Sequence, residues 1–301
     1  MPLPENVATS LGALPKHELL TSVMDGSFDG VISAADAAAL LSETGYSVEQ
    51  LTLWLASVAA LYALPPISNY KVGAIAEGIR PSGGPIGALY YGANMEFSGQ
   101  ALSFTLHAEQ SATVNAWQNG ETALTSLAVN EAPCGYCRQF LYEISTAQKL
   151  TVYLTGQAPQ PLTGLLPQAF GPGDLGINDR LLNPENHQLK LDTGSNDPVV
   201  LAALAAANSS YAPYTSGFAG VAVQTEGGAV YTGRYGENAA YNPAVSPLEA
   251  ALTMWNFAGN RLDTVTRCVL VEKFSPSDQR AATAAVLDAF AGLTPEYWFA
   301  S

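Results

Sequence analysis

Hydrophobic positions follow a helical period near the start of the chain. Apolar residues spaced three or four apart predict helices over 33–45 and 47–63, and a shorter run suggests another helix near 19–23. A serine begins each of the two longer ranges and is a favoured N-cap, whereas Pro65 and Pro66 end the second range. We therefore predict a small helical N-terminal domain over 1–48, followed by a helix that opens the next domain.

Short apolar runs replace this period further along the chain. Runs over 71–76 and 86–91 predict two strands on either side of a turn-rich stretch. The chain then alternates between the two periods, which predicts a helix over 105–117, a strand over 124–129, a helix over 135–146 and a strand over 150–154. Strands that alternate with helices favour an α/β fold with parallel strands in its second half.

Residues 156–198 are rich in proline, glycine and asparagine and show little periodicity. A stretch of this length without regular structure is rare inside one compact domain, so it predicts a connector between two domains. The predicted division is a helical domain over 1–48, a first core over 49–155, a connector over 156–197 and a second core over 198–301.

The second core repeats the first in outline. Three matches carry the comparison, which pair 220–223 with 72–75, 231–233 with 90–92, and 246–248 with 107–109. The second copy keeps the apolar positions, but it has Ser246 and Leu248 where the first copy has a histidine and a glutamate. We interpret the chain as a duplication whose second copy has lost its chemistry.

The balance of charge limits the partners that this chain can bind. Of its 301 residues, 26 are acidic and 12 are basic, which gives a formal net charge of -14 at pH 7, and 48% are hydrophobic. Such an acidic chain repels a phosphate backbone. To bind nucleic acid it would need a stripe of lysine and arginine residues, which the sequence lacks. Nucleic acid is therefore not an expected partner.

Cysteine usage and hydropathy point to a reducing compartment. The chain has only three cysteines, which is not the pattern of a disulfide framework. Its start lacks a basic stretch followed by an apolar core, and no apolar run approaches the roughly 20 residues that span a bilayer. We expect no signal peptide, no membrane segment and a cytoplasmic location.

Two short motifs carry the chemistry of the first core. The first is His107-Ala108-Glu109, and the second is Pro133-Cys134-Gly135-Tyr136-Cys137. His107, Cys134 and Cys137 make three ligands for one Zn²⁺ ion per chain and leave its fourth tetrahedral position open, as catalytic zinc requires. The cysteines lie at a predicted helix start, where the helix dipole favours thiolate over thiol.

This pair of motifs resembles the signature of zinc-dependent nucleobase deaminases, which implies a hydrolytic deamination. Glu109 is the candidate catalytic residue, and we expect it to move a proton from water to a ring nitrogen and then to the departing amine. A structural zinc site and a thiol redox pair are the alternatives. A structural site needs a fourth ligand, and the other histidines, His17 and His187, lie in predicted peripheral segments.

Over nearly its whole length the chain resembles cytidine deaminases of the long, two-core bacterial type. Asn94-Met95-Glu96 and the segment 66–74 resemble substrate-binding segments of that family. The resemblance implies that Asn94 and Glu96 hold the ribose 3′-hydroxyl. It also implies that Tyr70, where the family usually has phenylalanine, packs against the pyrimidine. The alternatives are a core aromatic at Tyr70, a turn residue at Asn94 and a solvated charge at Glu96.

The same resemblance implies the fold, the assembly and the reaction. The expected fold is a duplicated three-layer α-β-α cytidine deaminase-like core. The expected assembly is a homodimer in which the partner's second core closes each pocket, with 236–240 as the candidate segment. The expected reaction, in pyrimidine salvage, hydrolyses cytidine and 2′-deoxycytidine to uridine and 2′-deoxyuridine and releases ammonia. The alternatives are a nucleotide or polynucleotide cytosine deaminase and an inactive zinc-stabilised binding protein.

Overall fold

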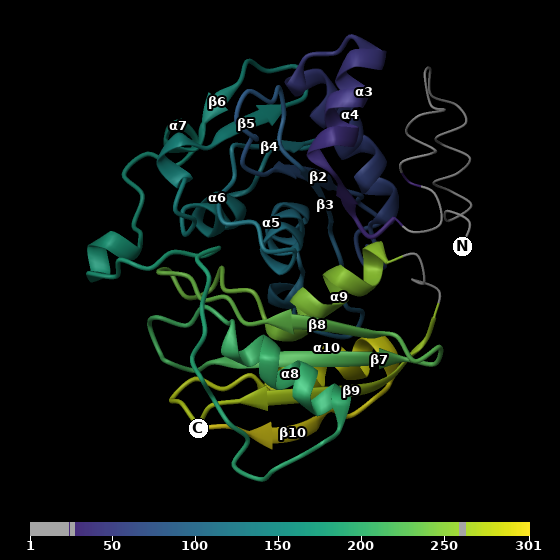
Figure 1. Cartoon of the computed structure of the whole chain (residues 1–301), viewed down its shortest axis with the longest axis vertical. Coiled ribbons are helices and arrows are strands. Elements are labelled where there is room, and N and C mark those ends of the chain that lie inside the picture. Colours follow the sequence, from purple (N-terminus) through teal and green to yellow (C-terminus); the bar gives the residue numbers. More distant parts are fainter. Residues whose placement is uncertain (1–23, 25–27, 259–262) are drawn as a thin grey trace.

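The computed structural model describes residue 24, residues 28–258 and residues 263–301, and two α/β units lie one above the other in it (Figure 1). The upper unit in this view is the first core and the lower unit is the second core. The helix that the sequence suggests near 19–23 lies outside the described residues. In the described part, no helix is both long enough and apolar enough to cross a bilayer.

Serine caps define the starts of two helices in the N-terminal part of the chain. α3 (Ala34–Thr44) begins after Ser33, whose side chain accepts a hydrogen bond from a backbone N–H of the first turn. α4 (Val48–Ala59) begins in the same way after Ser47 and continues as the 3-10 turn η1 (Ala60–Tyr62). Both predicted helices are confirmed.

The first core holds a six-stranded sheet in the order β1-β3-β2-β4-β5-β6. As the sequence predicted, β4 and β5 are parallel, while the other neighbours are antiparallel. The connector contributes β6 to this sheet. The strands are β1 (Val31–Ile32), β2 (Gly73–Glu77), β3 (Leu89–Ala93), β4 (Ser126–Val129), β5 (Thr151–Leu154) and β6 (Gln160–Pro161).

Helices cover both faces of this sheet, which confirms the expected three layers. α4 lies so close to β2 that a Cβ atom at Gly73 would be 2.1 Å from the carbonyl oxygen of Ala56. On the other face, α5 (Ala108–Gln118) approaches β3 as closely, since a Cβ at Gly92 would be 2.2 Å from the carbonyl oxygen of Ala108. Glycine permits this approach of helix and strand backbones because it has no side chain.

An extended segment before α5 determines the residue at which this helix begins. The sequence predicted this helix over 105–117, but it begins at Ala108. The backbone of Leu106 pairs with Met95 in both directions, at N···O distances of 2.9 and 3.0 Å, and keeps the chain extended up to His107. His107 is therefore the N-cap, and Glu109 lies in the first helical turn.

The second core repeats this arrangement around a four-stranded sheet of order β10-β9-β7-β8. α8 packs at Gly220 and α9 at Gly233, where added Cβ atoms would come within 2.2 and 2.1 Å of helix backbone atoms. The predicted repeat is confirmed, while the sequence analysis did not identify α10 and β10. The elements are α8 (Pro198–Asn208), β7 (Ala219–Thr225), β8 (Val230–Arg234), α9 (Pro247–Phe257), β9 (Val265–Glu272), α10 (Arg280–Ala291) and β10 (Glu296–Phe299).

The structural match between the two copies differs by one residue from the match made on sequence. Gly220 pairs across its sheet with the residue after Gly233, just as Gly73 pairs with the residue after Gly92. Segment 220–223 therefore matches 73–76, and the pairing with 72–75 is wrong. Short apolar runs do not define a register, whereas the contact of each glycine with a helix does.

The chain between the two cores has little regular structure. From β6 to α8 it forms only the short helices α7 (Leu162–Leu165) and η4 (Pro172–Leu175). Figure 1 shows this connector running down one side of the molecule from the first core to the second.

The two cores share one hydrophobic interior. Buried side chains from both, such as Trp117 and Leu248, belong to a single contiguous cluster. α5 lies against α9, and the hydroxyl oxygens of Ser111 and Thr253 are 3.4 Å apart at this contact. The second core is therefore part of the folded environment of α5.

A buried carboxylate ties α6 (Gly135–Leu141) to the second core. Glu143 is fully buried just beyond this helix. It accepts hydrogen bonds from the hydroxyls of Tyr211 and Tyr214 and from the backbone N–H of Ala239. The backbone of residues 143–144 pairs with Leu181 of the connector, so α6 ends at Leu141 and the prediction that it reaches residue 146 is wrong.

Candidate active site

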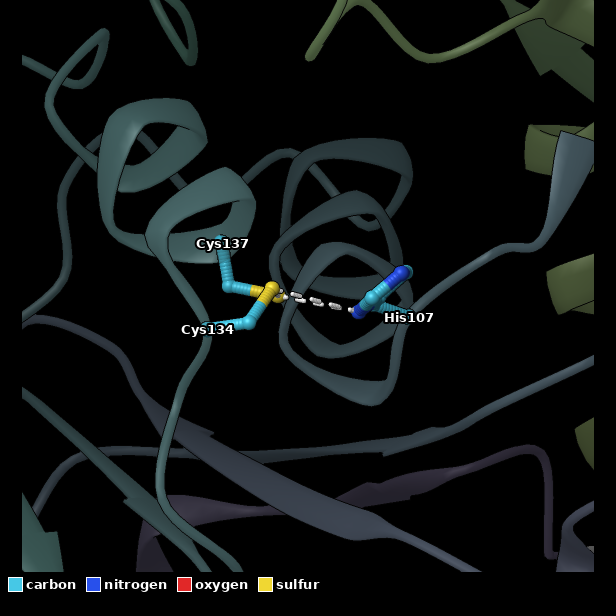
Figure 2. Close-up of side chains that lie close together, drawn as sticks. All are labelled: His107, Cys134 and Cys137. Atoms are coloured by element: carbon cyan, nitrogen blue, oxygen red, sulfur yellow. Dashed lines mark hydrogen bonds between the residues drawn. The ribbon is translucent and has the colours of Figure 1, made fainter. Parts of the chain in front are cut away.

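Two helix starts meet at one edge of the first sheet and bring three ligand side chains together. His107 is the N-cap of α5, Cys134 is the N-cap of α6, and Cys137 lies in the first turn of α6. Figure 2 shows the three side chains pointing toward one another from these two helices. The structure thus brings together the three residues that the sequence predicts as zinc ligands.

The separations of the ligand atoms fit a tetrahedral Zn²⁺ ion. The two Sγ atoms are 3.5 Å apart, and Nδ1 of His107 is 3.7 Å from Sγ of Cys134 and 3.3 Å from Sγ of Cys137. Zinc–sulfur bonds of about 2.3 Å and zinc–nitrogen bonds of about 2.0 Å give separations of about 3.5–3.8 Å at tetrahedral angles. The three residues therefore fit a zinc ion.

Neither alternative for the three residues agrees with this geometry. A structural site needs a fourth ligand, but within the described residues the cluster consists of these three side chains alone. The ring of His187 stacks on Phe218 and lies 2.7 Å from the carbonyl oxygen of Ser210, and His17 is outside the described residues. A redox pair would not need an imidazole within 3.3 Å of Cys137.

Local hydrogen bonds prepare Cys134 for metal binding. The thiol of Cys137 and the ring of His107 stabilise its thiolate and lower the pKa of Cys134 to about 3. Thiolate is the form of cysteine that binds zinc. The hydrogen bond with Cys134, together with burial, raises the pKa of Cys137, so Cys134 is the sulfur that is ionised at neutral pH before a cation is bound.

Glu109 lies beside this cluster and is only 4% exposed. It lines the same cavity as His107 and Cys134. Burial raises the pKa of Glu109 because it disfavours the charged carboxylate. A carboxyl group with a raised pKa, placed next to the ligands, is suited to accept and return a proton.

The cavity in front of the ligands has a volume of about 400 Å³, which suits a small polar molecule. Ala108 and Ala132 both lie in its wall. Tyr70, Asn94 and Glu96 line it as well. Of the sequence-predicted site residues, all but Cys137 therefore line one cavity.

Asn94 follows β3 and is 7% exposed. Its Oδ1 accepts a hydrogen bond from the backbone N–H of Val72 at 2.8 Å, and its Nδ2 donates to the carbonyl of Tyr70 at 2.9 Å. A side-chain amide has two N–H groups, so one donor remains for a ligand. Asn94 thus fixes the backbone around Tyr70, and the alternative of a simple turn residue does not describe it.

Glu96 holds the beginning of the same segment, 66–74, by hydrogen bonds. It accepts hydrogen bonds from the backbone N–H groups of Ile67 and Ser68, at 2.8 and 2.9 Å, and from the Ser68 hydroxyl at 2.5 Å. Partial desolvation opposes ionisation, but these bonds prevail and lower the pKa of Glu96. A carboxylate accepts about four hydrogen bonds, so room for one more remains. Glu96 is not a freely solvated charge.

Tyr70 is 55% exposed at the cavity, so the alternative of a core aromatic is wrong. Its backbone is held by Asn94, and the hydroxyl of Ser68 accepts a hydrogen bond from its N–H at 3.0 Å. Sequence reasoning did not identify Ser68 as a site residue. Its position within the segment 66–74 is the only sequence signal, because its partner Glu96 is distant along the chain.

The second core keeps the carboxylate that corresponds to Glu96. Glu237 accepts from the backbone N–H groups of Tyr214 and Thr215 and from the Thr215 hydroxyl, in the same pattern. Ser246 caps α9 where His107 caps α5, and Leu248 is fully buried where Glu109 would be. The hydrogen bonds of this carboxylate are therefore present in both copies, whereas the three candidate ligands and Glu109 belong to the first copy.

Comparison with known families gives two matches within this chain. The family described as "Cytidine and deoxycytidylate deaminase zinc-binding region" matches residues 47–154 and, in a second form, residues 162–285. Together the two matches cover more than half of the chain.

Several relatives are similar over most of their length. A protein named "Cytidine deaminase" from Photorhabdus laumondii is 44% identical over 90% of this chain and 90% of its own. One of the same name from Shewanella sediminis is 43% identical over 86% of this chain and 84% of its own. The crystal structure of cytidine deaminase from Mycobacterium tuberculosis is 28% identical, with a TM-score of 0.34, over 40% of this chain and 96% of that chain.

Proposed function

The chain belongs to the cytidine deaminase family, and we propose that Glu109 is the proton-transferring residue of its zinc-dependent reaction. The enzyme hydrolyses cytidine to uridine and ammonia. The observation that supports the assignment to Glu109 is its buried carboxylate beside the three ligand side chains, in the wall of one cavity. We extend the proposal to 2′-deoxycytidine, because Asn94 and Glu96 are proposed to bind the 3′-hydroxyl, which both nucleosides have.

His107, Cys134 and Cys137 would hold the zinc ion, which would supply Lewis acidity that makes a water in the cavity easier to deprotonate. Glu109 accepts the proton that this water loses. It donates this proton to the ring nitrogen next to the reacting carbon while the water oxygen bonds to that carbon. It then takes the second proton of this oxygen and gives it to the amine, so that the carbon–nitrogen bond breaks and ammonia leaves. One carboxyl group performs these transfers because it remains within hydrogen-bond reach of each atom.

The walls of the cavity orient the nucleoside. The remaining donor of Asn94 and the remaining acceptor of Glu96 are suited to a free 3′-hydroxyl, since one donates and the other accepts. Tyr70 lies at the rim with an exposed ring that can cover the pyrimidine. These groups support a nucleoside substrate over a nucleotide.

We assign the enzyme to pyrimidine salvage in the cytoplasm. Its three cysteines are free, and two of them are ligands that oxidation would remove. We also keep the division into a helical domain over 1–48, a first core over 49–155, a connector over 156–197 and a second core over 198–301.

We propose a homodimer in which the end of segment 236–240 reaches the partner's pocket. Glu237, Asn238 and Ala239 are buried within their own chain, so they serve that chain's fold. Ala240 is exposed, and the neighbouring Tyr241 is 66% exposed. The part available to a partner is therefore the end of the segment.

Replacing Glu109 with glutamine tests the catalytic assignment. The amide keeps the size of the side chain but cannot accept the proton, so we expect kcat for cytidine to fall by roughly 10²–10⁴-fold or more. Zinc content should stay at one per chain. Glu226→Gln, at an exposed carboxylate that does not line this cavity, is the matched control and should retain most of the activity. Full activity of E109Q, measured as loss of the ultraviolet absorbance of cytidine, would refute the role.

The charge of the cavity predicts its substrate class. Among the described residues, those that line the cavity include Glu96, Glu109 and Glu131 and contain neither lysine nor arginine. We expect kcat/KM for dCMP and for a single-stranded oligonucleotide to be at least about 100-fold below that for cytidine, because like charges repel. Added salt should narrow this gap. Equal values for cytidine and dCMP would favour the nucleotide deaminase instead.

Complementation tests the shared pocket. Ala240→Trp should block the partner's cavity, and E109Q should disable its own, so each variant alone is inactive. Co-expressed in equal amounts, they should regain about a quarter of wild-type activity, since half of the dimers are mixed and hold one intact site. Full activity of A240W alone, or no recovery in the mixed dimers, would contradict the proposed exchange.

A further inference from the structure

The imidazole of His107 has a neighbour outside the cavity. Its Nδ1 faces the two sulfur atoms, and the ring of Tyr136 stacks on its face, with ring centroids 5.3 Å apart and planes at 28°. Tyr136 lies between the two cysteines in the chain and is half-buried, yet it does not belong to the cavity wall. It therefore touches a ligand without reaching the space for substrate.

The second core anchors Tyr136. Its hydroxyl donates a hydrogen bond of 2.7 Å to the backbone carbonyl of Asn242, in the loop before α9. The ring of Tyr136 is thus fixed at one edge by the covalent chain of α6 and at the opposite edge by a carbonyl of the second core. A side chain held at both ends loses little further freedom when it supports His107.

The next residue of the same loop holds the backbone of His107. Gln110 donates from Nε2 to the carbonyl of Pro243 at 3.2 Å. Its Oε1 accepts from the backbone N–H of His107, also at 3.2 Å. The carbonyl of Asn242 therefore restrains the ring of His107 through Tyr136. The carbonyl of the adjacent Pro243 restrains the main chain of His107 through Gln110.

We propose that Tyr136 is a positioning residue for the metal ligand His107, and that the second core of the same chain acts on the zinc site through it. The inference rests on the proposed function of the three ligands. It assigns the second core a task within its own chain, separate from any contact with a partner. Groups that orient metal-bound histidines change metal affinity and activity when they are removed, commonly by about 10–100-fold.

Two substitutions separate the stack from its anchor. Tyr136→Phe keeps the ring and removes the hydrogen bond to Asn242, whereas Tyr136→Ala removes both. Tyr142→Phe is the matched control, because it removes a hydroxyl at the other end of α6 that interacts with Gln148. Each purified protein is stripped of metal, and its affinity for Zn²⁺ is measured in competition with a chromophoric chelator. The thermal midpoint of the metal-free form and kcat and KM for cytidine complete the set.

We expect Y136A to bind Zn²⁺ about 10–100-fold more weakly than Y142F. The affinity of Y136F should lie between those of Y136A and Y142F. In the zinc-loaded enzymes kcat should fall while KM for cytidine stays unchanged, because Tyr136 does not line the cavity. A structural role alone would lower the thermal midpoint without changing the affinity of the folded protein for Zn²⁺. Equal affinities of Y136F and Y142F overturn the proposal, and Y136F decides the matter if Y136A does not fold. Absence of Zn²⁺ binding in the wild type would refute the ligand assignment instead.

Discussion

The contact between Gly92 of β3 and the first turn of α5 determines where the reactive groups lie. A side chain at Gly92 would collide with the backbone of Ala108, the residue between the ligand His107 and the carboxylate Glu109. Helix and strand backbones touch at this point, so neither can slide without losing the contact. α6 starts beside the same edge of the sheet and adds Cys134 and Cys137. The zinc site is thus a consequence of how two helix starts pack on one sheet.

The duplication shows which features serve the fold and which serve the reaction. Gly220 and Gly233 repeat the glycine contacts of the first core, and Glu237 repeats the hydrogen bonds of Glu96. Leu248 fills the place of Glu109 with a buried apolar side chain. A buried carboxylate without a proton to transfer would cost stability, so its replacement by leucine is physically reasonable. The second core was kept as a scaffold that packs on α5 and α6.

Much of this structure is predictable from local sequence. Serine caps identify the starts of α3 and α4, and the spacing of His107, Cys134 and Cys137 predicts the candidate ligands that the fold brings together. The features that sequence did not predict depend on distant partners. The end of α6 coincides with the bridge between Ile144 and Leu181 of the connector, and the start of α5 depends on the bridge between Leu106 and Met95. The roles of Ser68 and Tyr136 likewise appear only once the fold brings Glu96 and Asn242 beside them.

The most direct test of the central claim is X-ray absorption at the zinc edge of the purified protein. We predict one zinc per chain, with two sulfur neighbours at about 2.3 Å, one imidazole nitrogen at about 2.0 Å and one further light atom in the open position. A first shell of four protein ligands would make the site structural. A protein that deaminates cytidine with no stoichiometric zinc would contradict the account altogether.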